Sequence, residues 1–326
     1  MKHLILLATL ALHASAATAT EAFEARVRQA DGWVAWNVPM VSDAGAPCCF
    51  AGEHWERTSC NLDERNRGFS TSDDARRPAS GTLTVYAHVA RSRIDDVRAF
   101  EASCPVRSNS EIRRLGDVAA TDSIGLLSSW MDRNDGARHE PALGAIAYHA
   151  DDAATRVLAS HAAAGHPREE RENALFWLGE ARGSDGASIV ERFATTDDDP
   201  KLREHAIFAL SESRVGDPYA RIRAISQSDR DGDVRARALF WMAQMKDERA
   251  AADITAALRT ERDENVREQA VFALSQLGGE KADDALIAIV RGDYPREIKK
   301  RALFWLGESG SPRAMALLDQ ALARPQ

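Results

Sequence analysis

Four cysteines lie near the N-terminus, close to a histidine that could share a metal site with three of them. Cys48, Cys49, His54 and Cys60 offer the thiolate and imidazole ligands that hold Zn²⁺. Their spacing does not match a paired CxxC framework, and outside the cytoplasm disulfide formation competes with thiolate ligation. With Cys104 the number of cysteines is even, which favours disulfides. Adjacent Cys48 and Cys49 cannot easily pair with each other. Each is therefore expected to pair with Cys60 or Cys104, and both pairings stay open.

The N-terminal residues predict export. Lys2 and His3 precede an apolar run from Leu4 to Leu12, and small residues suited to cleavage follow near residues 16 and 19. The run is too short to cross a bilayer, which takes about 20 apolar residues, and no later segment approaches that length. We expect residues 1–19 to be a signal peptide and the mature protein to be periplasmic or secreted.

Composition and motifs give little support to an enzyme. The formal charge is −8, and the 42 basic and 50 acidic residues are interspersed, so nucleic acid and anionic membranes are not expected partners. The sequence has no HExxH, GxSxG or glycine-rich phosphate loop. We predict no catalytic residues, no metal and no cofactor. The alternative is a metal- or thiol-dependent activity in the cysteine-containing region.

An internal repeat specifies the C-terminal part. The segment Ala-Leu-Phe-Trp-Leu-Gly-Glu at 174–180 returns with small changes every 32 residues, beginning at Ala206, Ala238, Ala270 and Ala302. A fixed period of this size is typical of a solenoid, in which each unit buries its apolar face against its neighbours. Each unit predicts two helices. A degenerate first unit around Ala142, which lacks the Phe, brings the total to about six units over residues 122–326.

The region before the repeats has residue patterns typical of β-strands. Segments 33–38, 82–89 and 97–103 are rich in β-formers or alternate in character, and 63–80 is a polar loop. We predict a small β-rich, disulfide-containing domain over residues 20–108 and a linker over 109–121. Asp122 is expected to be the N-cap of the first helix.

The recurring first helix of each unit resembles a known family. Its pattern [VLI]-[RK]-x-x-A-x-x-x-[LM]-[GSA], clearest from Val234 and Val266, resembles HEAT repeats of the short type named after phycobilisome lyases. The resemblance covers about residues 122–326. It implies an all-α HEAT-type α-solenoid with a right-handed superhelix. With the small β-rich N-terminal domain predicted above, the expected fold class is α+β with two domains. The resemblance also implies a binding scaffold.

Two enzymes are built from helices similar to these. Deoxyhypusine hydroxylase binds iron through repeated His-Glu dyads at helix starts, whereas this chain has the single dyad His139-Glu140, with no His before the equivalent positions of later units. One dyad cannot build that site. Bilin lyases share the repeat, but no residue here identifies a bilin site, and the predicted export argues against one.

One phenylalanine per complete unit falls on the polar side of its helix. Advancing about 100° per residue places Leu202, Ala206 and Leu210 on one side and Phe208 opposite them. The five equivalent residues are Phe176, Phe208, Phe240, Phe272 and Phe304. We expect them to form an apolar ridge that binds a protein or peptide, and the positions of Glu204 and His205 to lie on the same contact surface. The rim is predicted to consist of Glu180, Glu212, Gln244, Gln276 and Glu308. The alternative is an aromatic ladder that packs between units against Trp177, Trp241 and Trp305 and only stabilises the stack.

Charged residues recur at the unit junctions. Asp199, Asp231 and Asp263 are expected to cap the first helices. Arg203, Arg235, Arg267 and Lys299 form a second ladder. We predict that these basic residues pair with the recurring Asp residues in exposed ion pairs of small energetic value and have no binding role.

Overall fold

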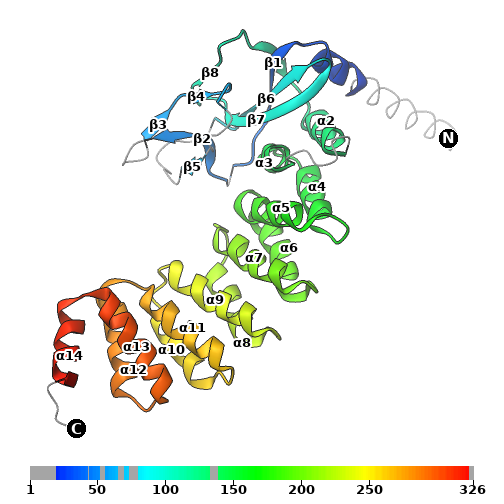
Figure 1. Cartoon of the computed structure of the whole chain (residues 1–326). Helices are drawn as coiled ribbons and strands as arrows, with labels where there is room; N and C mark the ends of the chain where they lie inside the picture. The colour runs from blue at the N-terminus through cyan, green and yellow to red at the C-terminus, as the bar shows by residue number, and fades with distance from the viewer. Residues whose placement is uncertain are drawn as a thin grey trace, which may run out of the picture. The chain divides into compact units, whose positions relative to one another are not determined.

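The structure is a computed structural model that describes residues 20–42, 44–51, 56–64, 70–72, 80–132 and 139–322 (Figure 1). The predicted signal peptide and His54 lie outside the described residues. The chain divides into two compact units, Met1–Gly186 and Ala187–Gln326, and each is described by itself. The described helices include none with the length and apolarity needed to cross a lipid bilayer.

A four-stranded sheet forms the centre of the β-rich region in the first unit. Its strands are β1 (Gly32–Pro39), β6 (Thr82–Ala90), β7 (Arg93–Glu101) and β9 (Arg113–Asp117), in the order β7-β6-β1-β9. The first two predicted strands are confirmed. The third begins earlier than predicted, because β7 pairs with β6 through a tight reversal at 91–92. Both β1 and β6 are largely buried, as the apolar residues of their sequences require.

Short strands make up the rest of this region, and several were not predicted. β2 (Ala46–Ala51) lies between β3 (Glu56–Thr58) and β5 (Ser70–Ser72), and β4 (Cys60–Asn61) pairs with β8 (Val106–Arg107). β5 falls within the predicted loop 63–80. β9 falls within the predicted linker 109–121, which is therefore wrong for these residues, since Arg113 pairs in parallel with Val34 of β1.

Two disulfides cross-link these short strands. Cys48 is bonded to Cys104, and Cys49 to Cys60, which settles the pairing that the sequence left open. The sulfurs lie in a buried cluster with the aromatic side chains of Trp33, Tyr86 and Phe100. Cross-links of this kind constrain the unfolded chain, which is most valuable where strands are too short to bury a large core.

Helices complete the first unit. They are α2 (Ala120–Asp132), α3 (Glu140–Ala147), α4 (Asp152–Ala162) and α5 (Arg168–Ala181), followed by α6 (Gly183–Thr196), in which the boundary between the units falls. α2 begins two residues before Asp122, so Asp122 lies in its first turn and the predicted N-cap is wrong.

A buried hydrogen-bond relay joins the sheet to these helices. The indole N–H of Trp36 in β1 donates to Ser123 Oγ in α2 over 2.8 Å, and Ser123 Oγ lies 2.8 Å from His149 Nε2. His149 Nδ1 is 2.8 Å from the carbonyl of Ala145. Because a carbonyl can only accept, Nδ1 carries the hydrogen, so Nε2 accepts from the Ser123 hydroxyl.

The second unit is a regular array of helix pairs (Figure 1). Its remaining helices are α7 (Pro200–Ser211), α8 (Pro218–Ser228), α9 (Gly232–Gln244), α10 (Ala250–Thr260), α11 (Glu264–Ser275), α12 (Gly279–Arg291), α13 (Arg296–Ser309) and α14 (Pro312–Leu322). The odd-numbered helices form one layer, in which each contacts the next, and the even-numbered helices cover it on one side. From α3 onward the described residues contain six helix pairs, as the repeat predicts.

The repeated residues explain this regularity. Ala206, Leu210 and their equivalents are fully buried between helices, as the angular analysis predicts. The capping prediction is also confirmed, because Asp199, Asp231 and Asp263 each accept hydrogen bonds from backbone N–H groups in the first turn of the following helix. The first helices α7, α9 and α11 therefore begin in the same way, whereas α13 begins after Pro295 without a side-chain cap.

Candidate functional site

The predicted Phe positions share one face of the odd-numbered helices. Within the second unit this face, called the Phe face below, is formed by α7, α9, α11 and α13. The Phe240 and Phe272 rings stack nearly parallel, with centroids 6.1 Å apart and planes 8° apart. Phe208 packs on Trp241 and Phe272 on Trp305, with 5.0 Å between centroids in each pair. The rings thus bridge successive helical repeats.

These contacts combine the two expectations for the ladder. Phe208, Phe240 and Phe272 are half-buried, so each ring packs against a neighbour while part of it stays accessible. Phe304, in α13, the last of the odd-numbered helices, is 53% exposed. In the first unit Phe176 is also half-buried and touches Trp177. The Phe face is therefore a packed ladder with accessible ring surface.

A pocket of about 250 Å³ opens on the Phe face beside the stacked pair. It is lined by Lys201 and Glu204 of α7, by Asp233, Ala236, Arg237 and Phe240 of α9, and by Asn265, Gln269 and Phe272 of α11. Within α9 the lining residues precede Phe240 by three, four and seven positions, which is the spacing of one helical stripe. The Phe rings, Glu204 and the positions equivalent to Glu204 and His205 (Ala236, Arg237 and Gln269) were predicted to share this surface. Lys201, Asp233 and Asn265 were not predicted, because a pocket depends on the spacing between adjacent helices.

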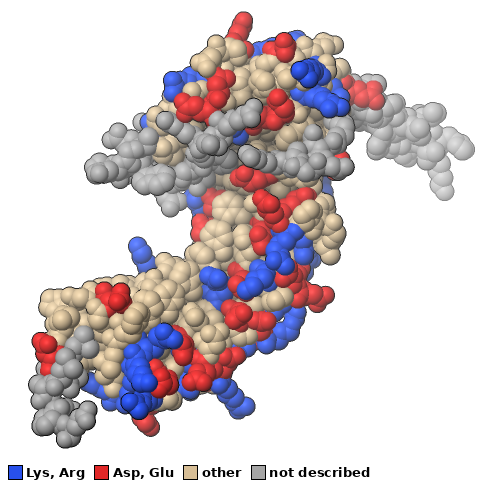
Figure 2. Space-filling view, viewed as in Figure 1, with Lys and Arg blue, Asp and Glu red and all other residues tan. Residues whose placement is uncertain are grey.

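The walls of the pocket carry both charges. Lys201 Nζ donates to Glu204 over 2.6 Å, and Arg237 lies 3.5 Å from the same carboxylate and above the Phe240 ring. The hydrogen bond to Glu204 raises the pKa of Lys201. Asn265 donates to Asp233 across the helices over 3.3 Å. Figure 2 shows basic and acidic side chains intermixed over the surface that it presents. The predicted rim of Glu and Gln residues is not what lines this pocket, whose walls carry charges of both signs.

The predicted rim residues differ in exposure. Gln244, Gln276 and Glu308 are exposed, and Glu212 is half-buried. Glu180, in the first unit, is only 6% exposed, so its predicted place on an open rim is wrong. Glu204 is also buried, because the cations beside it replace the water that a lone carboxylate would need.

The basic ladder departs from its prediction in partner and in burial. Arg203 is 1% exposed and pairs with Asp229 through two hydrogen bonds of 2.9 and 3.0 Å. Arg235 pairs with Glu261 in the same way. Both carboxylates lie two residues before the capping Asp rather than at it. Arg267 Nε, in contrast, has no hydrogen-bond partner among the residues that the structure describes.

The cysteines of the alternative site are cross-linked to one another. All four cysteines are in disulfides, so the sulfurs that were considered as metal ligands or nucleophiles are not free thiolates. A thiol or thiolate-metal chemistry would require their reduction.

A second cluster of polar side chains was missed by the sequence analysis. His139, His161 and His166 all contact the carboxylate of Glu170. Of these three histidines the sequence analysis considered only His139, as a member of the dyad with Glu140. Burial would raise the pKa of Glu170, but hydrogen bonds from His161 and His139 outweigh it and hold the pKa below its usual range. The spacing of His166 and Glu170 by four residues was the available sequence signal.

Comparisons with known proteins agree with the repeat. A family model described as HEAT repeats matches residues 219–305. Residues 219–305 are HEAT repeats. The match spans α8 to α13, which includes the pocket-lining helices α9 and α11. It confirms the family predicted from the recurring helix. A comparison with curated protein sequences found no match to this chain.

Solved structures similar to the chain include other helical proteins. Human deoxyhypusine hydroxylase in complex with glycerol is 15% identical, with 58% of this chain and 76% of that chain covered and a TM-score of 0.32. The Escherichia coli protein YibA is 18% identical, with 63% and 79% covered and a TM-score of 0.38. The complex of CpcE and CpcF of phycocyanin lyase from a Nostoc species is 18% identical, with 61% and 80% covered and a TM-score of 0.29.

Proposed function

We propose that the protein is an exported, non-enzymatic scaffold that binds a protein or peptide on its Phe face. The observation that supports this function is the pocket of about 250 Å³ beside the half-buried, stacked Phe240 and Phe272. Stacked HEAT repeats suit such a role, because successive first helices present a continuous surface. Apart from Ala236, polar residues line the remainder of the pocket.

The pocket chemistry indicates the kind of segment that would bind. Accessible edges of Phe240 and Phe272 suit an apolar side chain of the partner. Asn265 and Gln269 are exposed and can donate to or accept from its backbone. Because Arg237 and Asp233 flank the same space, the residues beside that apolar anchor are expected to be polar or of mixed charge. An extended or helical peptide with one apolar anchor per unit meets these conditions.

Export is part of the proposal and is supported by two features. The first residues have the charge, apolar run and small-residue pattern of a signal peptide. Two disulfides fit an oxidising compartment. Cell fractionation with N-terminal sequencing tests this part. A mature chain that begins near residue 17 or 20 in the periplasm or medium is expected, whereas an intact N-terminus in the cytoplasm would contradict export.

A pocket substitution tests binding better than removal of the rings. Replacing Phe208, Phe240 and Phe272 by Ser would also break the ring contacts between successive repeats, so a loss of binding could follow from unfolding. Gln269→Arg instead places a long charged side chain into the pocket from an exposed position of α11. Gln227→Arg, at an exposed position of the covering helix α8, makes the same chemical change away from the pocket.

The experiment uses a photo-cross-linking residue at position 269 or 227, followed by capture from an envelope extract. A partner is expected to cross-link from position 269 and not from 227. Capture should fall at least tenfold for Gln269→Arg and stay unchanged for Gln227→Arg, while both variants keep the wild-type melting temperature. Equal capture by the two variants would refute the proposed face.

A further inference from the structure

Three imidazole rings converge on one buried carboxylate in the first unit. Glu170 Oε1 lies 2.5 Å from His161 Nδ1 and 2.7 Å from His166 Nδ1, and Glu170 Oε2 lies 2.9 Å from His139 Nδ1. His161 is 7% exposed and Glu170 is 9% exposed. The His161 ring lies 4.8 Å from His166 and 6.4 Å from His139, centroid to centroid. Four potential ligands thus surround one small volume.

We propose that His139, His161 and Glu170, with His166 as the fourth ligand, bind a divalent transition-metal ion of the zinc class. Three imidazole nitrogens and one carboxylate oxygen are a ligand set that Zn²⁺ accepts in a tetrahedral arrangement. Imidazole suits Zn²⁺, Ni²⁺ and Cu²⁺, whereas Ca²⁺ and Mg²⁺ need mostly oxygen ligands. The site goes beyond the proposed scaffold function and does not depend on it.

The distances fit a site that is organised before the ion arrives. One ligand atom from each of His139, His161 and Glu170 lies within 4.8 Å of the others. Tetrahedral Zn²⁺ with bonds of about 2.0–2.2 Å holds its ligand atoms roughly 3.4 Å apart. The hydrogen-bonded nitrogen–oxygen pairs are shorter than this, and the widest pairs are longer. Side-chain shifts of roughly an ångström therefore convert the hydrogen-bonded cluster into a coordination sphere.

The chemistry of the contacts also favours a cation. A ring nitrogen that faces a carboxylate at hydrogen-bond distance needs a hydrogen or a cation between the two, because their lone pairs otherwise repel. Here three rings place Nδ1 against a single carboxylate, and two of them share one oxygen. One divalent ion at the centre satisfies all three nitrogens and the negative charge together.

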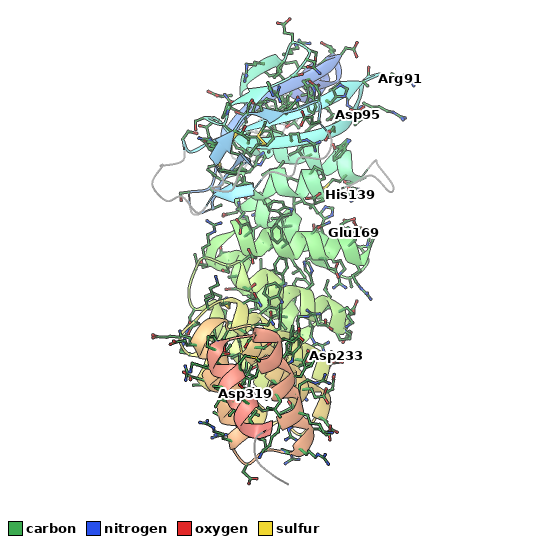
Figure 3. The ribbon with its side chains drawn as sticks, turned by 60° about the vertical axis from the view of Figure 1, so that its left-hand side comes forward. Arg91, Asp95, His139, Glu169, Asp233 and Asp319 are labelled. Atoms are coloured by element: carbon green, nitrogen blue, oxygen red, sulfur yellow. A yellow bond between two sulfur atoms is a disulfide. The ribbon has the colours of Figure 1, made fainter. Side chains whose placement is uncertain are left out.

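The ligands come from three consecutive elements, so the ion would be a cross-link between them. His139 precedes the first residue of α3, His161 lies in the last turn of α4, and Glu170 lies in the first turn of α5. Figure 3 labels His139 and Glu169, the neighbour of Glu170, and shows them on the same side of adjacent elements. His166, in the loop before α5, is exposed and gives the ion a path from solvent.

This arrangement is not the His139-Glu140 dyad of the sequence analysis. Glu140 is exposed and contributes no ligand atom to the cluster. The carboxylate comes instead from Glu170, thirty residues later. The site is therefore built by packing of the first two helix pairs rather than by a repeated dipeptide.

Zn²⁺ binding to the tag-free full chain, first stripped with a chelator, tests the proposal by calorimetry and by competition with a chelating dye. One equivalent is expected to bind and to raise the melting temperature of the first unit by several degrees. Loss of one ligand in His166→Ala should weaken binding at least tenfold, and Glu170→Gln should abolish it. His88→Ala is the matched control, because His88 Nδ1 contacts a single carboxylate, Asp95, over 2.6 Å.

Co²⁺ substitution supplies a second readout that separates coordination from structural damage. The wild type and His88→Ala are expected to show the intense visible bands of tetrahedral Co²⁺, and His166→Ala to show altered bands. His166 is exposed, so this variant should fold even where Glu170→Gln does not. A wild-type chain that binds no Zn²⁺, or a His166→Ala chain with unchanged affinity and an unchanged Co²⁺ spectrum, would overturn the site.

Discussion

His149 makes the stability of the first unit sensitive to mild acid. Its side chain is fully buried, and this burial, reinforced by the Arg182 guanidinium and opposed by hydrogen bonds to the backbone, lowers the pKa of His149 to about 4. An unfolded chain has a histidine pKa of about 6.5. The lowered pKa means that the unfolded state binds a proton more readily. Stability is therefore complete above pH 6.5 and falls as the pH drops towards 4.

The magnitude follows from this difference in pKa. A shift of about 2.5 units corresponds to about 3 kcal/mol when the group is fully protonated in both states, and to about 2 kcal/mol at pH 5. Protonation at Nε2 would also remove the acceptor that Ser123 uses. Ser123 Oγ would then face two donors, because the indole N–H of Trp36 can only donate. Glutamine at position 149 keeps an amide near the carbonyl of Ala145 and cannot titrate.

Urea unfolding of the wild type and of His149→Gln at pH 7 and pH 5 measures the effect. The wild type should lose about 2 kcal/mol more than the variant between these pH values, although the variant starts from a lower free energy of unfolding. Other titrating groups are common to both proteins and cancel in the comparison. Equal losses in the two proteins would show that His149 is not held neutral by burial, and the reasoning would fail.

Three further results are expected. Arg203→Ala should lower the free energy of unfolding by about 3–5 kcal/mol, because it leaves the buried Asp229 carboxylate unpaired. Arg249→Ala should cost much less, because it removes solvent-exposed pairs with Asp217 and Asp247. Urea unfolding measures both losses, and equal losses in the two variants would contradict this reasoning. Glu101→Gln should reduce the loss of unfolding free energy between pH 4.5 and 2. Burial raises the pKa of Glu101, but hydrogen bonds from Ser and Arg side chains hold it at about 2. The stability that Glu101 contributes in the wild type is therefore lost as the pH falls through that range. Phe304→Ser should cost less than Phe240→Ser, by about 1 kcal/mol or more in thermal unfolding. Phe240 is half-buried and stacks on Phe272 of the next repeat, whereas Phe304 is 53% exposed and packs on the adjacent Trp305.

The period of the repeat was sufficient to predict the helical array. Alanine at positions such as 206 and 238 must face the next helix, because only a small side chain allows that close packing, and the structure buries both completely. The capping aspartates followed from the same register. The β-rich region was less predictable. Its strands β4 and β8 have two residues each and exist because distant segments pair, which leaves no periodic signal.

The candidate sites show the same limit. Phe240 and Phe272 were recognised because they are apolar residues on the polar side of an amphipathic helix. The pocket beside them also needs Lys201 and Asp233 from neighbouring helices, and local spacing does not show how closely two helices lie. His139 and Glu170 are farther apart still in sequence, and only the packing of α3 against α5 brings them together.

The ion pairs between units have a consequence for how such arrays change in evolution. Arg203 pairs with Asp229 and Arg235 with Glu261, each 26 residues later, and each carboxylate also accepts the backbone N–H of the following capping Asp. The same contact therefore recurs in the same register at successive junctions. Duplication or loss of a gene segment that encodes 32 residues would place an equivalent Arg and carboxylate at the new junction, so no new contact would have to arise. The array can thus lengthen or shorten by recombination, and the surface available to a ligand would grow or shrink with it.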